Sequence, residues 1–576
     1  MQALRRSALT FFDKWRASVM HRICDVLCGK QRLDEAEKQK QGIASLIDFD
    51  ENPFAQAAPK KIEKHGHYDV IQTQILALDE QKRVLILHCH LLLLLSLEHY
   101  PAHSKVLLLS LTSSFELETN LLGEHEKSVA QGLLATAASQ MDAEATTKRQ
   151  ASNDAATRRW KVGLAAVGGA VLIGVTGGLA APLLAAGLGT VMGGLGLGVV
   201  STYLGALVGS SVLVGSLFGA YNAKMTGKLM KQYAQEVRDF EFLPVEDEED
   251  ARDPAKRERH RLRVTIGVSG WLSSPSDVFK PWEVIDTDSS EPFALRFELD
   301  AMLRLGTSLQ DVLFSYAWDG LAYTVVSRTL LGAFYAGLWP LGLIKAGKVL
   351  AHALIDGVQG KRPVTLTGYS VGARVIFACL VELAEQHAFG LVESVVLMGT
   401  PAPSSQKQWR QIRSVGTARV VNIYSTEDYV LGYLYRCTKL EMGVAGLDEV
   451  RAVHGIETVD VSKLVNGHDK YRYLVGRILV DIGLGDVNFS KIAEQERALE
   501  LAEKKKKHVK EQAKRNKSEP DQSAKQIAAR ASTAGNEDSD YDEVNHARRR
   551  GRMPFIHKVT GSRNMPANTH SAIRAV

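Results

Sequence analysis

The sequence predicts an α/β fold with a mostly parallel sheet, preceded by an α-helical region and a glycine-rich segment suited to a membrane. Two observations support this class. Between residues 262 and 486, short β-branched runs alternate with segments that are apolar at helical spacing, which is typical of parallel strands joined by helices. Earlier, residues 162–223 hold no charged side chain and many glycines. Hydrophobic residues make up 45% and charged residues 23% of the 576 residues, which are values of a globular chain.

The strand-to-helix junction at residues 362–386 carries the clearest chemical motif. A β-branched run leads into Gly368, Ser370 and Gly372 in G-x-S-x-G spacing, and an apolar helical pattern follows. This is the order of a nucleophile elbow, in which a strained turn raises the serine above the sheet at a helix N-terminus. The sequence therefore predicts an α/β-hydrolase-type fold with Ser370 as the nucleophile. The alternative is an ordinary turn in which Ser370 caps the helix.

A nucleophilic serine needs a base and an acid that orients the base, and in this fold they follow in the order acid, then histidine. The run over 418–424 predicts a strand, after which come Glu427 and Asp428. A second run over 459–465 precedes His468 in a glycine-containing loop. We predict Asp428 as the acid, with Glu427 as its rival, and His468 as the base. The alternatives are a turn residue at Asp428 and a surface histidine at His468.

An oxyanion hole needs two backbone N–H donors close to the serine. Val371, the residue after the nucleophile, is expected to supply one. The other is expected from the loop after a strand predicted over 263–268, where Gly270 allows a close approach of the backbone. We place this second donor at Trp271 or Leu272, and the alternative is a plain glycine turn.

Four sequence blocks resemble those of the transmembrane and coiled-coil domain-containing protein 4 family. This is a eukaryotic group of membrane-linked α/β-hydrolase-like proteins that includes a yeast lipase-like protein linked to coated-vesicle traffic. The blocks are residues 269–272, 368–374, 424–428 and 467–471, and the similarity extends over roughly residues 65–485. Val371 stands where most members carry leucine. The resemblance implies a Ser–Asp–His site, a lipid or acyl substrate and a partner in the trafficking machinery, but no established substrate.

The uncharged block over 162–223 is long enough for about two or three membrane helices. Its glycine pairs in G-x-x-x-G spacing favour close packing of such helices. Lysine and arginine at both ends favour a two-span hairpin, with both ends and the hydrolase domain on the cytosolic side. The alternatives are a glycine-rich helical pair buried in protein and a hairpin that enters only one leaflet.

Other segments carry weaker signals. The basic residues 1–33 predict a helix lying on a membrane, a weak mitochondrial presequence or a poorly ordered helix. Residues 70–137 are expected to be helical, and their histidines lack the spacing of a metal site. In the later domain we expect a helix over 292–305, a strand over 311–317, and a lid or further membrane contact over 321–355. The segment 494–517 predicts a charged helix or coil, followed by disorder.

In chain order we predict six segments. They are a basic N-terminal segment with its linker (1–64), a helical domain (65–150), a membrane-inserted glycine-rich segment (161–223), a charged linker (224–261), an α/β-hydrolase domain (262–486) and a charged, largely disordered tail (487–576). The five cysteines show no zinc spacing, so we expect no metal and no other cofactor. The basic runs lack a folded nucleic-acid recognition motif, so nucleic acid is not an expected partner.

The sequence thus favours a membrane-associated serine hydrolase of the lipase or esterase type. Its substrate would be a carboxylic ester of a lipid or acyl compound, and its partners membrane lipid and a trafficking-machinery protein. The alternative is a catalytically inert scaffold or vesicle-trafficking factor built on the same fold.

Overall fold

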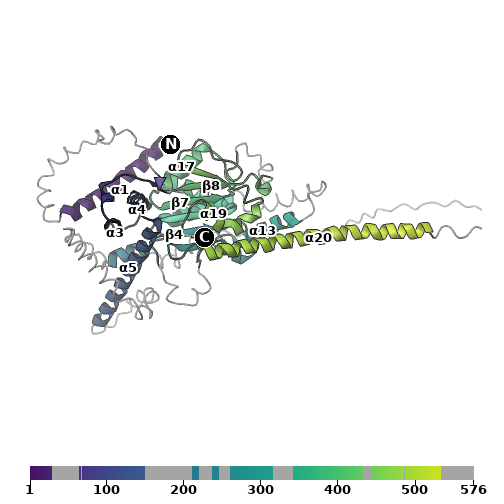
Figure 1. Ribbon diagram of the computed structural model, residues 1–576, viewed down its shortest axis with the longest axis horizontal. Coiled ribbons are helices and arrows are strands. Elements are labelled where there is room, and N and C mark those ends of the chain that lie inside the picture. Colours follow the sequence, from purple (N-terminus) through teal and green to yellow (C-terminus); the bar gives the residue numbers. More distant parts are fainter. Residues whose placement is uncertain are drawn as a thin grey trace, which may run out of the picture. The chain divides into compact units, whose positions relative to one another are not determined.

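The computed structural model describes residues 1–28, 64–65, 68–148, 211–219, 237–245, 260–314, 341–432, 443–485 and 487–533. The chain forms two units, Met1–Val509 and Lys510–Val576. The first unit contains a sheet of seven strands with helices around it (Figure 1).

The strands lie in the order β3-β5-β4-β6-β7-β8-β9. Only the edge pair β3–β5 is antiparallel, so the predicted mostly parallel sheet is confirmed. Every residue of β4, β6 and β7 is buried, as expected for strands covered on both faces. The strand bounds are β3 (Glu241–Pro244), β4 (Val264–Val268), β5 (Glu291–Arg296), β6 (Val364–Tyr369), β7 (Val392–Met398), β8 (Val420–Tyr424) and β9 (Ile456–Asp460).

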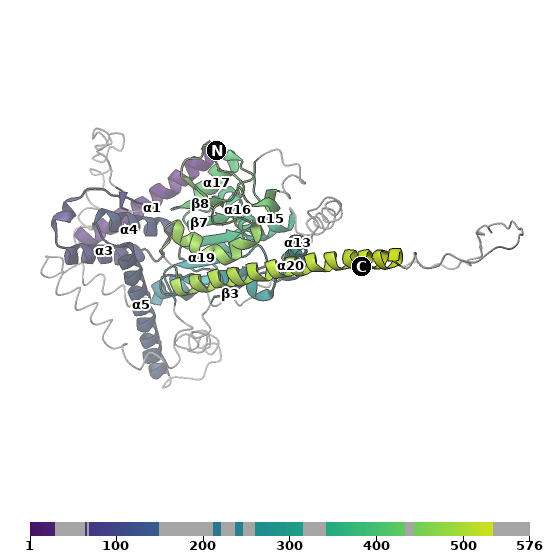
Figure 2. The same cartoon turned by 45° about the vertical axis from the view of Figure 1, so that its right-hand side comes forward.

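The direction in which strands are added to the sheet reverses between β4 and β6. After β4 the chain forms β5 on one side and then β6 on the other, and β7 to β9 follow outward. Ligands of parallel sheets bind at the carboxyl ends of the strands at such a reversal. Helix α16 (Val371–Glu385) starts at this point and packs against α15 (Leu341–Ile355) and α17 (Gln406–Val415), its neighbours in Figure 2.

Three local predictions in this domain are wrong. The strand expected over 459–465 is β9, which ends at Asp460, and residues 462–464 form a turn. Pro292 lies in β5, and the helix expected from there begins only at Leu299, as α13 (Leu299–Phe314). Strands on both sides of β5 satisfy its backbone and bury Phe293, which outweighs the helical spacing of the apolar residues. The strand expected over 311–317 starts inside α13, and residues 315–340, with most of the predicted lid, lie outside the described residues.

The helical region contains α3 (Glu80–Leu95), α4 (Ala102–Ser114) and α5 (Thr119–Lys148), which surround a second apolar core. A buried polar network lies within it, because the Tyr100 hydroxyl donates to Glu126 at 2.5 Å and the Lys105 ammonium pairs with the same carboxylate at 2.7 Å. The backbone N–H of Tyr100 also donates to the Lys361 carbonyl at 2.9 Å. This bond ties the helical region to the residues that lead into β6.

The N-terminal helix α1 (Gln2–Cys28) is packed against the rest of the first unit. The apolar face of α1 contacts α4. There the Trp15 indole donates to the Ser104 hydroxyl at 3.2 Å, and the Phe11 ring lies 5.5 Å from the His103 ring. The apolar stripe that would enter a membrane is therefore packed against protein. The members of this stripe, at helical spacing, are Leu4, Ala8, Phe11, Trp15 and Val19.

Most of the predicted membrane hairpin lies outside the described residues, which include only 211–219 of it. In this piece Leu213, Leu217 and Phe218 are buried in the core of the helical region. No helix in the described part of the chain is both long and apolar enough to span a bilayer.

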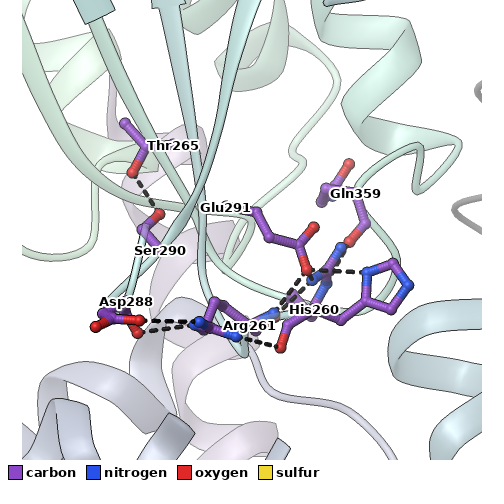
Figure 3. Close-up of polar contacts among 8 residues, drawn as sticks. His260, Arg261, Thr265, Asp288, Ser290, Glu291 and Gln359 are labelled. Carbon is purple, nitrogen blue, oxygen red and sulfur yellow. Dashed lines mark hydrogen bonds and ion pairs between the residues drawn. The ribbon is translucent and has the colours of Figure 1, made fainter. Parts of the chain in front are cut away.

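A polar cluster closes the amino ends of β4, β5 and β6 (Figure 3). The Glu291 carboxylate accepts hydrogen bonds from the Arg261 backbone at 2.6 Å, from the Arg362 guanidinium at 2.8 Å and from the His260 ring at 3.1 Å. The Phe218 ring stacks on His260 and lies beneath Arg362, 5.1 Å from its guanidinium carbon. The cluster therefore fixes the end of the glycine-rich segment to the sheet.

The last described element is α20 (Phe489–Thr533). The sequence predicts disorder beyond residue 517, whereas the helix continues to Thr533. Residues 534–576 lie outside the described part.

Candidate active site

Ser370 lies in a strained turn between β6 and α16. Its backbone has φ 57° and ψ −134°, a conformation that costs energy for any residue with a Cβ and that clusters at functional sites. The turn is held in place because the Ser370 N–H donates to the Met398 carbonyl of β7 at 2.9 Å. Ser370 accepts no side-chain cap bond, so its hydroxyl points away from the helix backbone. The alternative of an ordinary N-cap serine is therefore not observed.

Glycines make this turn sterically possible. A Cβ on Gly372 would lie 2.1 Å from the Val268 carbonyl oxygen of β4, and a Cβ on Gly368 would lie 2.7 Å from the Ile376 side chain. A Cβ on Gly270 would lie 2.1 Å from the Tyr369 carbonyl oxygen. These distances show that the elbow and the loop after β4 touch through their backbones, which only glycine permits.

The structure brings together Ser370, His468 and Asp428, three buried residues from distant parts of the chain. The His468 Nε2 atom lies 2.6 Å from the Ser370 hydroxyl, and its Nδ1 atom lies 2.5 Å from Asp428 Oδ2. The carboxylate can only accept, so Nδ1 carries the proton and Nε2 accepts the hydrogen bond of the serine. The three side chains thus form one hydrogen-bonded chain at the carboxyl end of the sheet.

Two further bonds set the position of the acid. The second oxygen of Asp428 accepts from the Leu431 backbone N–H at 3.0 Å, and the Ser425 hydroxyl joins the acid loop to the base loop by donating to the Val465 carbonyl at 2.6 Å. Glu427, the rival acid, has an exposed side chain. The geometry therefore pairs His468 with Asp428 and leaves Glu427 outside the site.

Two aromatic rings flank the imidazole of His468. The Trp271 ring lies 5.8 Å from it on one side, and the Tyr471 ring lies 5.8 Å away in an edge-on arrangement. Both aromatic residues are almost fully buried, so the imidazole sits in a site with little water. Sequence reasoning considered Trp271 only as a backbone donor and did not select Tyr471, although its position three residues after the histidine was a usable signal.

The candidate oxyanion donors lie beside the serine. A Cβ on Gly270 would be 2.5 Å from the Val371 backbone nitrogen, which places the loop of Trp271 and Leu272 against the elbow. Within the described part of the chain, the N–H groups of Val371, Trp271 and Leu272 have no hydrogen-bond acceptor. Uncommitted backbone donors next to a buried hydroxyl are what an oxyanion hole requires.

The histidines of the helical region do not converge on a metal. His90 and His99 contact backbone carbonyls of their own turns, His88 stacks edge-on against His125, and His103 contacts α1. Burial lowers the pKa of both His88 and His103 to about 4, so these two rings are neutral at physiological pH. Among the described residues, no group of three or more potential ligands is close enough to hold an ion.

Fold and site together define an α/β protein with a hydrogen-bonded serine, histidine and aspartate at the carboxyl edge of a parallel sheet. The chain belongs to the family described as "Protein of unknown function (DUF726)", whose model matches residues 155–485. The matches establish this broad family, and the narrower one that the sequence blocks resemble remains a prediction.

Several curated proteins are similar to the chain. "Uncharacterized membrane protein C6F6.13c" of Schizosaccharomyces pombe is 37% identical over 452 residues, which cover 73% of this chain and 76% of that protein. "Transmembrane and coiled-coil domain-containing protein STS1" of rice is 36% identical over 419 residues, 67% of this chain and 61% of the relative. "Probable lipase MIL1" of Saccharomyces cerevisiae is 32% identical over 297 residues, 48% of this chain and 27% of the relative. No solved structure matches significantly.

Proposed function

We propose that this protein is a membrane-associated serine hydrolase that cleaves the carboxylic ester of a lipid or acyl substrate. The observation that carries the proposal is the continuous chain from the Ser370 hydroxyl through the His468 ring to Asp428, with the serine held in a strained turn. Strand, turn and helix follow one another as in the nucleophile elbow of α/β-hydrolases. The similarity to a protein named a probable lipase supports the same class.

In the first half of the reaction, the Ser370 oxygen attacks the ester carbonyl carbon while its proton passes to His468 Nε2. Asp428 accepts the Nδ1–H bond, keeps the ring in the productive tautomer and stabilises the imidazolium that forms. When the tetrahedral intermediate collapses, the carbonyl carbon–alkoxy oxygen bond breaks. The leaving alcohol takes the proton from Nε2, and an acyl-serine remains.

In the second half, His468 Nε2 takes a proton from water while the water oxygen attacks the carbonyl carbon of the acyl-serine. The bond from that carbon to the Ser370 oxygen then breaks, the serine oxygen takes the proton back from Nε2, and the carboxylic acid is released. The negative charge of each tetrahedral intermediate lies on the former carbonyl oxygen. The Val371 N–H and an N–H of Trp271 or Leu272 would stabilise that charge in a site with little water. No cofactor takes part in these steps.

The membrane assignment rests on the relatives, because two of those described above carry membrane or transmembrane in their names. An enzyme held at a bilayer meets lipid esters at high local concentration, which favours them over soluble esters. The cytosolic orientation and a partner in vesicle traffic belong to the same proposal. The orientation depends on the basic residues that flank the uncharged block at 162–223, and the partner depends on the family resemblance.

A catalytically inert scaffold is the less favoured function. Backbone strain at Ser370 destabilises the fold, and a scaffold gains nothing from keeping it. The buried pairing of His468 with Asp428 likewise offers no evident benefit to a surface that only binds partners.

The test is covalent labelling of the purified full-length protein with a fluorophosphonate, which reacts with activated serines. Wild type is compared with Ser370→Ala and His468→Ala, and hydrolysis of p-nitrophenyl esters of increasing acyl length is followed in parallel. We expect labelling of wild type only, and ester turnover that changes with chain length. Folded wild-type protein that neither labels nor hydrolyses any ester, in detergent or in vesicles, would refute the hydrolase and favour the scaffold.

A further inference from the structure

We propose that the C-terminal helix α20 clamps the loop that carries His468, and that Asp469, Lys470, Glu503 and Lys506 are positioning residues for this histidine. The inference rests on the proposed function in one respect, that His468 is the catalytic base. It assigns a role to a lysine-rich segment whose composition predicts only a solvated charged helix.

The base loop is a short segment that depends on contacts with other elements for its position. His468, Asp469 and Lys470 form a single short turn between Gly467 and α19 (Tyr471–Asp481). A hydrogen bond from the Lys470 N–H to the Gly467 carbonyl at 3.1 Å closes this turn. Contacts from other elements, such as the Ser425 hydrogen bond to the Val465 carbonyl, help to keep the imidazole within hydrogen-bond distance of Ser370, and α20 supplies two more.

The first part of α20 is fixed to the domain at its beginning. Ile492 is buried and packs on Gly476 of α19, where an added Cβ would lie 2.7 Å from the Ile492 side chain. The Gln495 side chain accepts from the Gly476 N–H at 3.2 Å and donates to the Pro281 carbonyl at 3.0 Å. These contacts orient α20 across α19, so that its next turns reach the base loop.

Two ion pairs then join α20 to the residues directly after His468. The Lys506 ammonium pairs with the Asp469 carboxylate, and the Lys470 ammonium pairs with the Glu503 carboxylate. Glu503 and Lys506 are three residues apart and therefore lie on one face of the helix. The charges alternate, so α20 presents an acid to the basic residue of the loop and a base to its acidic residue.

Burial separates the Asp469–Lys506 pair from ordinary surface pairs, and the Lys470–Glu503 pair is intermediate, with side chains 16% and 42% exposed. The Asp469 side chain is only 9% exposed and that of Lys506 27%, whereas Lys504 and Glu500, which pair with each other on the same helix, are 74% and 69% exposed. Exposed pairs of the second kind contribute almost nothing to stability. The buried Asp469 carboxylate, in contrast, needs the Lys506 cation, because an unpaired buried charge is costly.

The consequence is a shift in the population of base-loop conformations. With the clamp in place His468 stays aligned with Ser370 and Asp428. Without it the loop moves, fewer molecules have the ring in position, and the chemical step slows while substrate binding is unchanged. The effect would therefore be on kcat rather than on KM.

The test uses full-length variants of both pairs. Lys470→Glu and Glu503→Lys each place like charges together, and the double variant restores an ion pair with reversed polarity. Lys506→Met removes the cation from Asp469, and Lys504→Met, which removes an equal charge from the same lysine run, is the matched control. Two quantities are measured: kcat and KM for an ester, and hydrogen–deuterium exchange of the amides of residues 463–471.

We expect each single reversal and Lys506→Met to lower kcat about tenfold with KM unchanged, since small misplacements of a catalytic group have large effects. The reversed pair should recover most of the loss, and Lys504→Met should resemble wild type. Hydrogen–deuterium exchange of residues 463–471 should be faster in the impaired variants. In the reversed pair and in Lys504→Met it should be close to the wild-type rate. A reversed pair no better than either single variant, or a Lys504→Met variant as impaired as Lys506→Met, would overturn the clamp.

The exchange measurement keeps this inference separate from the proposed function. If wild type hydrolyses nothing, the hydrolase proposal fails, but loop protection in the variants still decides whether α20 holds the loop. If wild type is active and loop exchange is the same in all variants, the clamp fails while the hydrolase proposal stands.

Discussion

The polar cluster at the amino ends of the strands allows a quantitative test of how the sheet is stabilised. Arg362→Met removes the guanidinium that pairs with Glu291 at 2.8 Å and that also donates to the carbonyls of Gln359 and Arg261. The Met side chain fills a similar volume but leaves the Glu291 carboxylate buried without its main cation. Because this cluster lies at the opposite end of β6 from Ser370, the change tests the fold without altering the candidate active site.

The size of the loss follows from the pKa of Glu291. Burial by itself would raise that pKa, but Arg362 and then His260 outweigh burial and lower it from 4.5 to about 2. A difference of this size corresponds to roughly 3 kcal/mol of folding free energy at neutral pH. Breaking a buried pair by removing one partner costs about 3–5 kcal/mol, which agrees with that figure.

The loss should depend on pH in a definite direction. In wild type the folded pKa of Glu291 lies below the unfolded value, so its stabilisation is complete above pH 4.5 and is lost as the pH falls towards about 2. In Arg362→Met burial is no longer offset by the guanidinium, so the folded pKa rises above the unfolded value and protonation stabilises the variant. The difference between the two proteins should therefore shrink between pH 7 and pH 5.

The assay is urea-dependent hydrogen–deuterium exchange of the β5 and β6 amides at both pH values, which reports the opening of the core strands. Arg419→Met is the matched control, because Arg419 also pairs with a glutamate, in this case through two hydrogen bonds. That glutamate, Glu457, is 39% exposed, whereas Glu291 is 9% exposed. The control should lose only about 1 kcal/mol, since water can solvate the remaining carboxylate. Equal losses in the two variants, or a difference that grows on acidification, would refute the argument.

Three further predictions concern the site and the N-terminus. Asp428→Asn should lower the fluorophosphonate labelling rate about 10³- to 10⁴-fold, because the amide favours the wrong imidazole tautomer. Glu427→Gln should leave the labelling rate unchanged. A large loss in Glu427→Gln with none in Asp428→Asn would make Glu427 the acid. Gly270→Ala should reduce the labelling rate about 100-fold or more in folded protein, because the new Cβ meets backbone atoms of the elbow at 2.1–2.5 Å. A variant that labels at the wild-type rate would contradict this and show that the loop can move to accommodate the Cβ. Phe11→Ala should weaken the packing of α1 by about 2 kcal/mol and so speed proteolysis within residues 1–28. The control is Phe12→Ala, which should have a smaller effect because the Phe12 ring is more exposed. Equal proteolysis rates in the two variants would contradict the packing of α1.

The local chemistry of this protein could be predicted from residues that are neighbours along the chain. The β-branched run, the glycines around Ser370 and the apolar helix after it are neighbours along the chain, so their periodicity and turn chemistry are sufficient to predict the elbow. The mostly parallel sheet followed from the alternation of strands and helices in the same way. Asp428 and His468 could be nominated because they come directly after predicted strands, whose carboxyl ends meet at one edge.

Two kinds of assignment needed the folded structure: the choice between acidic residues that are adjacent in the sequence, and the pairing of residues with distant partners. Glu427 and Asp428 are both acids in one turn, and the direction of the backbone, set by packing of β8, points one to solvent and the other to His468. Pro292 is in a strand because β3 and β4 pair with it from both sides, which no local pattern records. The contacts of Glu503 and Lys506 with the base loop join residues more than thirty positions apart. Such pairings depend on how α19 and α20 pack, and a lysine run alone carries no sign of which of its charges will be buried.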